Sequence, residues 1–388
     1  MRLRLILPRV EPDKIIPPRA CPQAGCPGRH FRLRQRVAKP VRDTVHARVT
    51  ARRYECLRCR HTFRVYPPGV NADHTSQRVK GLAVMLYLLG LSYGAVALAL
   101  EALGVYLCKS RVYDAVQAAA KKVPGLKRRQ VFGGVHTPAV GADVTSVKCR
   151  GQWLPLGLSV DPLSGIVLSV DRLPNEEAET LQTWLAPIAA AVGAQLLVSD
   201  DADGFKTVAD QLGLEQQICK SHVRRNTDAL VENLTPLARH DADGSLARLG
   251  VTSAQAVADV TRLGELIQTR QPAQAAELSA LQARYAAARP PRPGQSASLA
   301  YRLRLLFLDR WNLWGRLTRY RTWRGPDGET LDGTNNASER AIGWWVKERY
   351  RTMRGYKRPT SAVNVSRLLA WCGNHLQRGG ADLACLLA

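Results

Sequence analysis

Residues 140–170 read VGADVTSVKCRGQWLPLGLSVDPLSGIVLSV, which is three runs rich in Val and Leu with polar turns between them. The runs 140–148, 153–160 and 166–170 have the length and composition of β-strands, and the turn at 161–165 separates the last two. Connections this short join strands that run in opposite directions. The stretch therefore predicts a three-stranded antiparallel meander.

Helices and single strands alternate after the meander. A helix is predicted from near Asn175, with Glu176, Glu177 and Glu179 in its first turn, where the positive end of the helix dipole favours carboxylates. A strand at 195–199, a helix at 204–212 and a strand at 216–219 follow. This element order is that of an RNase H-like α/β fold. The pattern alone leaves the order of the strands in the sheet open.

Two carboxylates have notable positions on these strands. Asp143 lies among valines within the first strand, where an unpaired charge is costly, and Asp200 follows the fourth strand. If these strands are neighbours, both side chains meet at one edge and share a divalent cation, Mg²⁺ or Mn²⁺, which prefer hard oxygen ligands. Two alternatives stay open. In the first, Asp143 is a solvated strand-end residue and binds no metal. In the second, Asp200 forms the turn of the 199–204 loop, which also contains Asp201 and Asp203.

Four cysteines near the start of the chain form two close pairs, Cys21 with Cys26 and Cys56 with Cys59. Zinc prefers four tetrahedral thiolate or imidazole ligands, and two pairs separated by 29 residues can close around one ion from the turns of two short hairpins. The alternative is two solvent-exposed thiol pairs without a metal. The spacing favours a structural Zn²⁺ site.

The positive charge of the chain is concentrated in two windows. The formal net charge is +24, of which residues 1–60 contribute +12 and residues 301–360 contribute +8. Because neutralising phosphates releases condensed counterions, this distribution favours a polyanionic partner, most simply double-stranded DNA, with anionic lipid as the competing interpretation.

Membrane insertion and export are disfavoured by the sequence. Residues 81–100 carry no charge, but Gly90, Ser92, Tyr93 and Gly94 interrupt the stretch, which fits two short buried helices better than one spanning helix. The opening MRLRLILPRV has too short an apolar run for a signal peptide. Nine cysteines without an even disulfide-like spacing favour a reducing compartment. We expect no membrane segment and a cytoplasmic, nucleoid-associated protein.

A helix-turn-helix is predicted between the cysteine module and the meander. Helices fit 76–89, 92–103 and 110–122, with Gly104 between the last two. In such a motif the last helix enters the major groove. The candidate DNA contacts there are Lys109, Arg111, Tyr113, Gln117 and Lys121. The alternative is a small helical bundle without a DNA-binding role.

Three motifs resemble a known family. The block TNNASER at 334–340, followed by a basic segment, resembles the last catalytic block of bacterial insertion-sequence DDE transposases related to the Mutator-like type. The block SDDADGF at 199–205 is similar to the second-aspartate block of that family, although Asp201 stands where the family usually has Gly. Cys219 and His222 resemble its Cys-x-x-His signature. Half of a second zinc site is an alternative for this pair, but no other pair stands nearby in sequence to complete it, so His222 is expected near the scissile phosphate or the Asp200 loop, with Cys219 buried at a strand end. The resemblance covers residues 131–376, and an N-terminal zinc ribbon with a helix-turn-helix is similar to the arrangement in several members.

The resemblance implies a catalytic triad of Asp143, Asp200 and Glu339, with two Mg²⁺ or Mn²⁺ ions between them. It also implies a division into five segments. These are a zinc ribbon at 1–70, a helix-turn-helix at 71–130, the first part of the RNase H-like core at 131–222, an α-helical insertion at 223–330, and the C-terminal part of the core at 331–388.

The implied activity is that of a transposase, which cleaves the ends of a mobile DNA element and joins the freed 3′-OH to target DNA. A homodimer or higher oligomer is expected in the synaptic complex. Further candidate DNA contacts are His222, Arg340, Lys347, Arg351 and Arg354. For the basic residues after Glu339 a solvated basic face is the alternative, and for Trp344 and Trp345 core packing is favoured over base stacking.

Two other classes of function fit the same motifs. The first alternative is a DNA-binding regulator with an inactive core. The second is a metal-dependent nuclease without strand transfer. The regulator predicts that Asp143→Asn, Asp200→Asn and Glu339→Gln leave biological activity intact. The nuclease predicts cleaved DNA without a joined product.

Overall fold

The computed structural model describes residues 5–126, 135–348, 350, 356–377 and 381–382. The chain forms two compact units. The first comprises Met1–Gln130, Val147–Trp153 and Trp344–Ala388, and the second comprises Val131–Ser146 and Leu154–Gly343. The segment 331–388, which the sequence analysis expects to complete a single core, is therefore divided between the two units.

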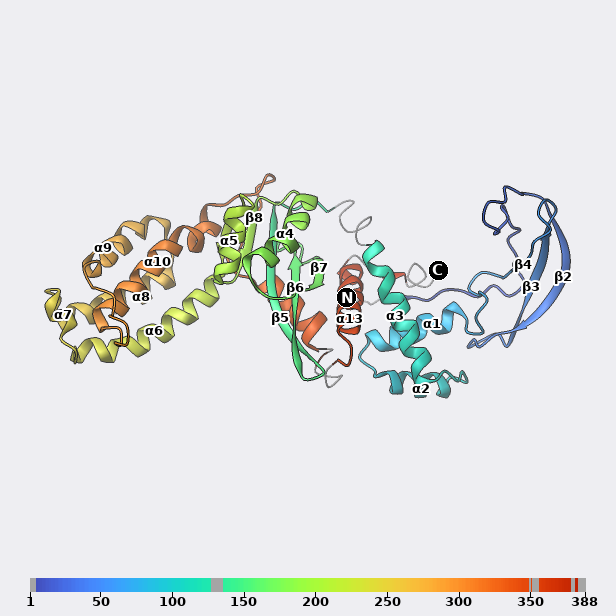
Figure 1. Ribbon diagram of the computed structural model, residues 1–388, viewed down its shortest axis with the longest axis horizontal. Coiled ribbons are helices and arrows are strands. Elements are labelled where there is room, and N and C mark those ends of the chain that lie inside the picture. The colour runs from blue at the N-terminus through green and yellow to red at the C-terminus, as the bar shows by residue number, and fades with distance from the viewer. Residues whose placement is uncertain (1–4, 127–134, 349, 351–355, 378–380, 383–388) are drawn as a thin grey trace. The chain divides into compact units, whose positions relative to one another are not determined.

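The first unit begins with an antiparallel sheet of β2 (Phe31–Pro40), β3 (Arg48–Cys56) and β4 (Thr62–Val65), drawn in blue in Figure 1. Its apolar core is small: Val10, Val41, Val49 and Val70 form a cluster, and Ala51, Tyr54 and Cys56 of β3 are also buried. A core this small supplies little stability by itself. A short parallel pair joins β1 (Leu5–Ile6) to β10 (Ala381–Asp382).

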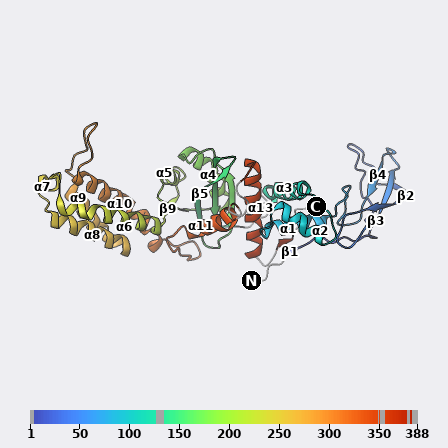
Figure 2. The same cartoon turned by 90° about the horizontal axis from the view of Figure 1, so that it is seen from below.

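Three helices follow in the first unit, α1 (Gln77–Leu88), α2 (Tyr93–Ala102) and α3 (Lys109–Leu126). Ser76 and Ser92 cap the first two, each accepting the backbone N–H three residues on, which confirms the two helices predicted within the uncharged stretch 81–100. The C-terminal helix α13 (Pro359–Gln377) packs on α3 (Figure 2). No described helix has the length and apolar character needed to cross a bilayer.

The second unit contains a mixed five-stranded sheet in the order β7-β6-β5-β8-β9. The strands are β5 (Ala139–Cys149), β6 (Gln152–Val160), β7 (Val167–Arg172), β8 (Leu196–Ser199) and β9 (Glu215–Ile218). β6 and β7 are antiparallel, and β5, β8 and β9 are parallel. The expected pairing of the first strand with the fourth is thus confirmed.

Two helices cover one face of this sheet, α4 (Ala178–Val192) and α5 (Asp203–Gln211), whose apolar sides pack on Val140, Ala142 and Leu197. α4 starts later than predicted. Glu177 is its N-cap residue and only Glu179 lies in its first turn, because the residues before 177 are still extended or turning. A backbone N–H of Glu177 donates instead to the Asn175 side chain.

A helical bundle interrupts the chain between β9 and the last helix of the second unit. It consists of α6 (Lys220–His240), α7 (Ser245–Arg248), α8 (Ser253–Thr269), η2 (Pro272–Gln274), α9 (Ala275–Tyr285) and α10 (Leu299–Thr322) (Figure 1). The bundle has its own apolar core, with Phe307 stacked on Tyr285. Arg316 of α10 binds Asp210 at 2.8 Å, and so the long helix also contacts the sheet layer. The helix α11 (Asn336–Ile342) and the π-helix η3 (Gly343–Lys347) follow.

Candidate functional site

The register of the parallel strands places two candidate acids side by side. Gly141 of β5 pairs with Val198 of β8; Asp143 stands two residues further along β5, and Asp200 directly follows the last residue of β8. Because side chains alternate between faces, both acids lie on the sheet face opposite α4 and α5. Neighbouring strands are about 4.8 Å apart. Both residues are partly exposed, so this face of the sheet carries two adjacent carboxylates within reach of solvent.

The next strand brings a cysteine to the same level. Ser199 pairs with Ile218 of β9, so Cys219 follows at the level of Asp200, and its backbone N–H donates to the Ser199 carbonyl at 2.8 Å. Cys219 is fully buried. Helix α6 begins directly after it at Lys220, which places His222 in the first turn.

The start of α11 is fastened to this face by three contacts. The Asn335 side-chain amide donates to the Ala142 carbonyl at 3.1 Å, and the Asn335 backbone N–H donates to Cys219 Sγ at 3.3 Å. Ser338 lies over Gly141, where a Cβ atom would come within 2.8 Å of Ser338 Oγ and 2.9 Å of Val160 Cγ2. Only glycine at position 141 leaves room for this approach, which carries the next residue, Glu339, onto the same face.

Glu339 meets His222 and Cys219. Its Oε1 lies 3.6 Å from His222 Nδ1, and ligand atoms of Cys219, His222 and Glu339 all lie within 4.8 Å of one another. Among the described residues this is one of two groups of His, Cys, Asp and Glu close enough to hold a metal ion, and neither Asp143 nor Asp200 belongs to it. The structure thus brings Glu339 to the face of the two aspartates but gathers it with the Cys-x-x-His pair.

Asp200 differs from the neighbouring Asp201 and Asp203 in its interaction partners. Asp201 and Asp203 both bind Lys206, at 2.9 and 3.0 Å. Burial alone would lower the pKa of Lys206, but these two carboxylates outweigh it and hold the pKa above its usual range. Asp200 instead accepts the Ala202 N–H at 3.1 Å, so it also forms the turn that the alternative interpretation expects. Asp201 is compensated by a lysine.

The four cysteines of the first unit form the second metal-ligand group, with ligand atoms within 4.8 Å of one another. The Sγ atoms of Cys21 and Cys59 are 3.6 Å apart, and those of Cys26 and Cys56 are 3.9 Å apart. Four sulfurs around one zinc ion lie about 3.8 Å apart, so the donors fit that metal. Only Cys56 and Cys59 lie on a β-hairpin, between β3 and β4. The first pair lies in a turn outside any strand, contrary to the prediction of two hairpins.

The four thiols differ in the pKa shifts that their surroundings cause. Desolvation is the main factor that raises the pKa of Cys21 to about 12, and the pKa of Cys26 is also raised. Hydrogen bonding to the backbone at Cys59 lowers the pKa of Cys56 to about 7. The Cys56 thiol therefore ionises near neutral pH, while the Cys21 and Cys26 thiols retain their protons there.

The predicted DNA-contact residues of α3 divide into two groups. Lys109, Arg111 and Lys121 are exposed. Gln117 is buried and accepts the Asn364 amide at 3.0 Å, and Tyr113 lies 2.9 Å from the Ser361 hydroxyl. These two polar residues hold α13 against α3, a role that helix periodicity could not reveal because α13 lies about 250 residues away.

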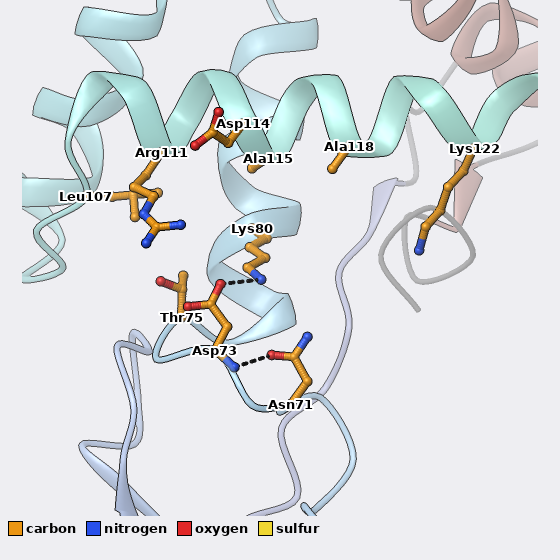
Figure 3. Close-up of a pocket in the computed structure, with 10 residues that line it drawn as sticks. All are labelled: Asn71, Asp73, Thr75, Lys80, Leu107, Arg111, Asp114, Ala115, Ala118 and Lys122. Atoms are coloured by element: carbon orange, nitrogen blue, oxygen red, sulfur yellow. Dashed lines mark hydrogen bonds and ion pairs between the residues drawn. The ribbon is translucent and has the colours of Figure 1, made fainter. Parts of the chain in front are cut away.

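A cavity of about 310 Å3 lies beside α3 in the first unit (Figure 3). Arg111 and Lys122 of α3 line it together with Lys80 of α1, whose ammonium group binds Asp73 at 2.7 Å. Burial alone would raise the pKa of Asp73, but Lys80 outweighs it and holds the pKa below its usual range. The cavity therefore has paired charges as well as two basic side chains.

The remaining predicted contacts lie near the end of the chain. Arg340 and Lys347 are exposed, whereas Arg351 and Arg354 lie outside the described residues. Trp344 is 70% exposed, contrary to the prediction of core packing, while Trp345 packs against Gly373 of α13. The sequence analysis missed Asn335 and Ser338 as positioning residues, although both belong to the TNNASER block that it singled out.

The comparisons with known proteins are limited. No protein-family model matches the chain, and no curated protein matches it in sequence. Among solved structures, the HTLV-2 integrase catalytic core domain in complex with magnesium is similar in two forms. The dimeric form has 23% identity over 27% of this chain and 73% of that chain, and the trimeric form has 20% over 33% and 84%. The catalytic core domain of BIV integrase has 14% identity over 50% and 90%. Each TM-score is 0.19, too low to relate the folds.

Proposed function

We propose that the protein is a DDE transposase, a metal-dependent polynucleotidyl transferase that cleaves the ends of a DNA element and joins the freed 3′-OH to target DNA. The observation that carries the proposal is the strand register, which aligns Asp143 with Asp200 on the sheet face that also receives Glu339. Two adjacent strand-borne carboxylates and a third on a helix are the donor set that metal-dependent phosphodiester chemistry requires.

The sheet order supports an RNase H-like core for this activity. In chain order the five strands are arranged third, second, first, fourth and fifth, and the last two add in parallel to the first. In this proposal Asp143 on β5 and Asp200 directly after β8 act together, since β5 and β8 are neighbours. In this proposal the helical bundle at 220–322 is an insertion between the second and third acids.

Asp143, Asp200 and Glu339 would hold two Mg²⁺ or Mn²⁺ ions. Bound there, the ions would lower the pKa of an attacking water and stabilise the leaving 3′ oxygen. The donors fit these cations, since all three are hard oxygen ligands. The Glu339 side chain is 43% exposed, and the proposal requires it to turn from His222 towards the aspartates.

DNA would be held by charges outside this face. The exposed Lys109, Arg111 and Lys121 of α3 are the proposed contacts of the helix-turn-helix, and Arg340 and Lys347 are those that follow the third acid in the sequence. Such contacts neutralise phosphates, so binding should weaken steeply with added salt. A zinc ribbon built on the four cysteines would add to this binding, and synapsis of two element ends calls for a dimer or higher oligomer.

The test is an assay of cleavage and joining. The full-length protein is incubated with Mg²⁺ or Mn²⁺, a target plasmid and DNA carrying the sequences that flank its own gene. We expect nicked ends and joined product from the wild type, and neither from Asp143→Asn or Asp200→Asn. Asp203→Asn is the matched control, because this acid in the first turn of α5 is 96% exposed and pairs with Lys206.

Two results would replace the proposal. Cleavage without joined product would indicate a nuclease. Specific DNA binding without cleavage, combined with unchanged biological activity of the Asp143 and Asp200 variants, would indicate a regulator.

A further inference from the structure

Cys219, His222 and Glu339 form a donor set that differs in kind from the three acids. Cys219 Sγ is buried and accepts the Asn335 backbone N–H, a contact that orients a sulfur ligand. His222 Nδ1 is buried and has no hydrogen-bond partner among the described residues. It faces Glu339 Oε1 at 3.6 Å, which is longer than a hydrogen bond. A buried ring nitrogen in this position can serve as a metal ligand.

The chemistry of the three donors selects zinc over magnesium. Thiolate and imidazole are soft or borderline ligands that suit Zn²⁺, whereas Mg²⁺ takes oxygen donors almost exclusively. Tetrahedral zinc holds such atoms about 3.3–3.8 Å apart, and here all lie within 4.8 Å. One distance within the group, 3.6 Å between His222 Nδ1 and Glu339 Oε1, already lies in this range. Three protein ligands would leave the fourth position to water.

We propose that Cys219, His222 and Glu339 form a second zinc site, and that zinc bound there withdraws Glu339 from Asp143 and Asp200 and stops DNA cleavage. The inhibitory part rests on the proposed transposase function, whereas the zinc site itself does not. The reason for mutual exclusion is that Glu339 is one carboxylate shared by two sites. An oxygen held on zinc beside His222 is unavailable to ions between the aspartates.

Metal content tests the site without DNA. The full-length protein is stripped of metal, loaded with Zn²⁺ under reducing conditions, separated from free metal and analysed for zinc per chain. We expect two equivalents for the wild type, one for the four cysteines and one for the new site. His222→Ala, at a partly exposed side chain, should retain one. Cys372→Ala is the matched control and should retain two, because this buried thiol belongs to neither metal-ligand group among the described residues.

Cobalt gives a second readout of the same site. Co²⁺ in the four-cysteine group is bound by four thiolates, whereas Co²⁺ in the new site is bound by one. The difference spectrum of wild type minus His222→Ala should therefore show a single weak thiolate-to-cobalt band. Glu339→Gln gives an independent variant in case Cys219→Ser fails to fold. One zinc per chain in the wild type, or two in His222→Ala, would overturn the zinc site.

The inhibitory part is tested by cleavage in excess Mg²⁺ with increasing Zn²⁺. We expect Zn²⁺ to suppress cleavage by the wild type by at least about tenfold, and the same Zn²⁺ to change the residual activity of His222→Ala much less. If the wild type binds two zinc equivalents and cleavage is undiminished, the inhibitory part of the proposal is overturned, while the zinc site itself stands. A wild type that never cleaves DNA would overturn the proposed function instead, while the metal content still decides the zinc site.

Discussion

The two metal-ligand clusters of this protein are assembled in opposite ways. The four cysteines come from two short turns within residues 21–59, and their spacing is visible in the sequence. Cys219 and His222 meet Glu339 only across more than a hundred residues, through the register of three strands, the start of α6 and the fastening of α11 over Gly141. A local cluster can be recognised by spacing, whereas a distant one depends on the complete fold of its unit.

The surroundings of the two clusters also differ. The sheet that carries Cys56 has a small apolar core, with a cluster of four valines, and Cys59 is exposed. Cys219 is fully buried in a unit with extensive apolar packing. A module with so small a core gains its stability from bound metal, while the second cluster is held in place by a sheet that folds without it.

The largest expected effect is therefore loss of the N-terminal zinc. Structural zinc contributes about 10–16 kcal/mol of apparent binding free energy, so Cys56→Ser should unfold the sheet of β2, β3 and β4. Hydrogen exchange measures this as loss of amide protection there, with protection in β5 and β8 unchanged. Cys108→Ser, at a partly exposed thiol outside both clusters, is the control. Continued protection of the N-terminal sheet in Cys56→Ser would contradict metal-dependent folding.

The next prediction distinguishes Asp143 from Glu339, because only Glu339 belongs to the group with Cys219 and His222. Asp143→Asn should reduce DNA cleavage at least about 100-fold, because a metal ligand in the proposed active site is lost. Its zinc content should stay at the wild-type value. Glu339→Gln should lose both cleavage and one zinc equivalent. Parallel cleavage and metal assays check this, and equal zinc content in the two variants would show that Glu339 belongs to one site only.

A smaller effect is expected from filling the space above Gly141. The added Cβ of Gly141→Ala meets Ser338 Oγ and Val160 Cγ2 at less than 3.0 Å, so α11 must shift at a cost of about 1–3 kcal/mol. Hydrogen exchange should show that cost as a lower opening free energy of β5 and α11, and the second zinc should bind more weakly.

Gly315→Ala in α10 provides the control for this substitution. Its Cβ meets no atom within 4 Å among the described residues, and alanine favours a helix, so we expect equal or slightly greater stability. A Gly141→Ala protein as stable as Gly315→Ala would mean that the contact with Ser338 does not fasten α11.

The smallest effect is the pH dependence of the four-cysteine site. At pH 7.5 the raised pKa values keep Cys21 and Cys26 protonated, so zinc binding should release at least two protons, and affinity should rise with pH. Below the Cys56 pKa of about 7, a third proton must be displaced, so affinity should fall more steeply there. Calorimetry in buffers of different ionisation enthalpy measures the protons. A number that stays constant from pH 6 to 8 would contradict the depressed pKa of Cys56.

Much of the local structure was open to prediction. Ser76 and Ser92 cap helices where the sequence places them, and the strands of the second unit lie within a few residues of their expected positions. The adjacency of the first and fourth strands, expected for the fold type, is present as well. These features depend on interactions between residues close in sequence or on a small set of permitted chain connections.

What the sequence alone determined was the four-cysteine spacing, the caps and the alternation of strands and helices, because each is fixed within a few residues by local geometry. Only the tertiary structure assigned Gln117 to the packing of α13 and gathered Glu339 with Cys219 and His222. Contacts between residues more than a hundred positions apart depend on strand register and on the close approach of helices. Composition and spacing contain no direct record of either.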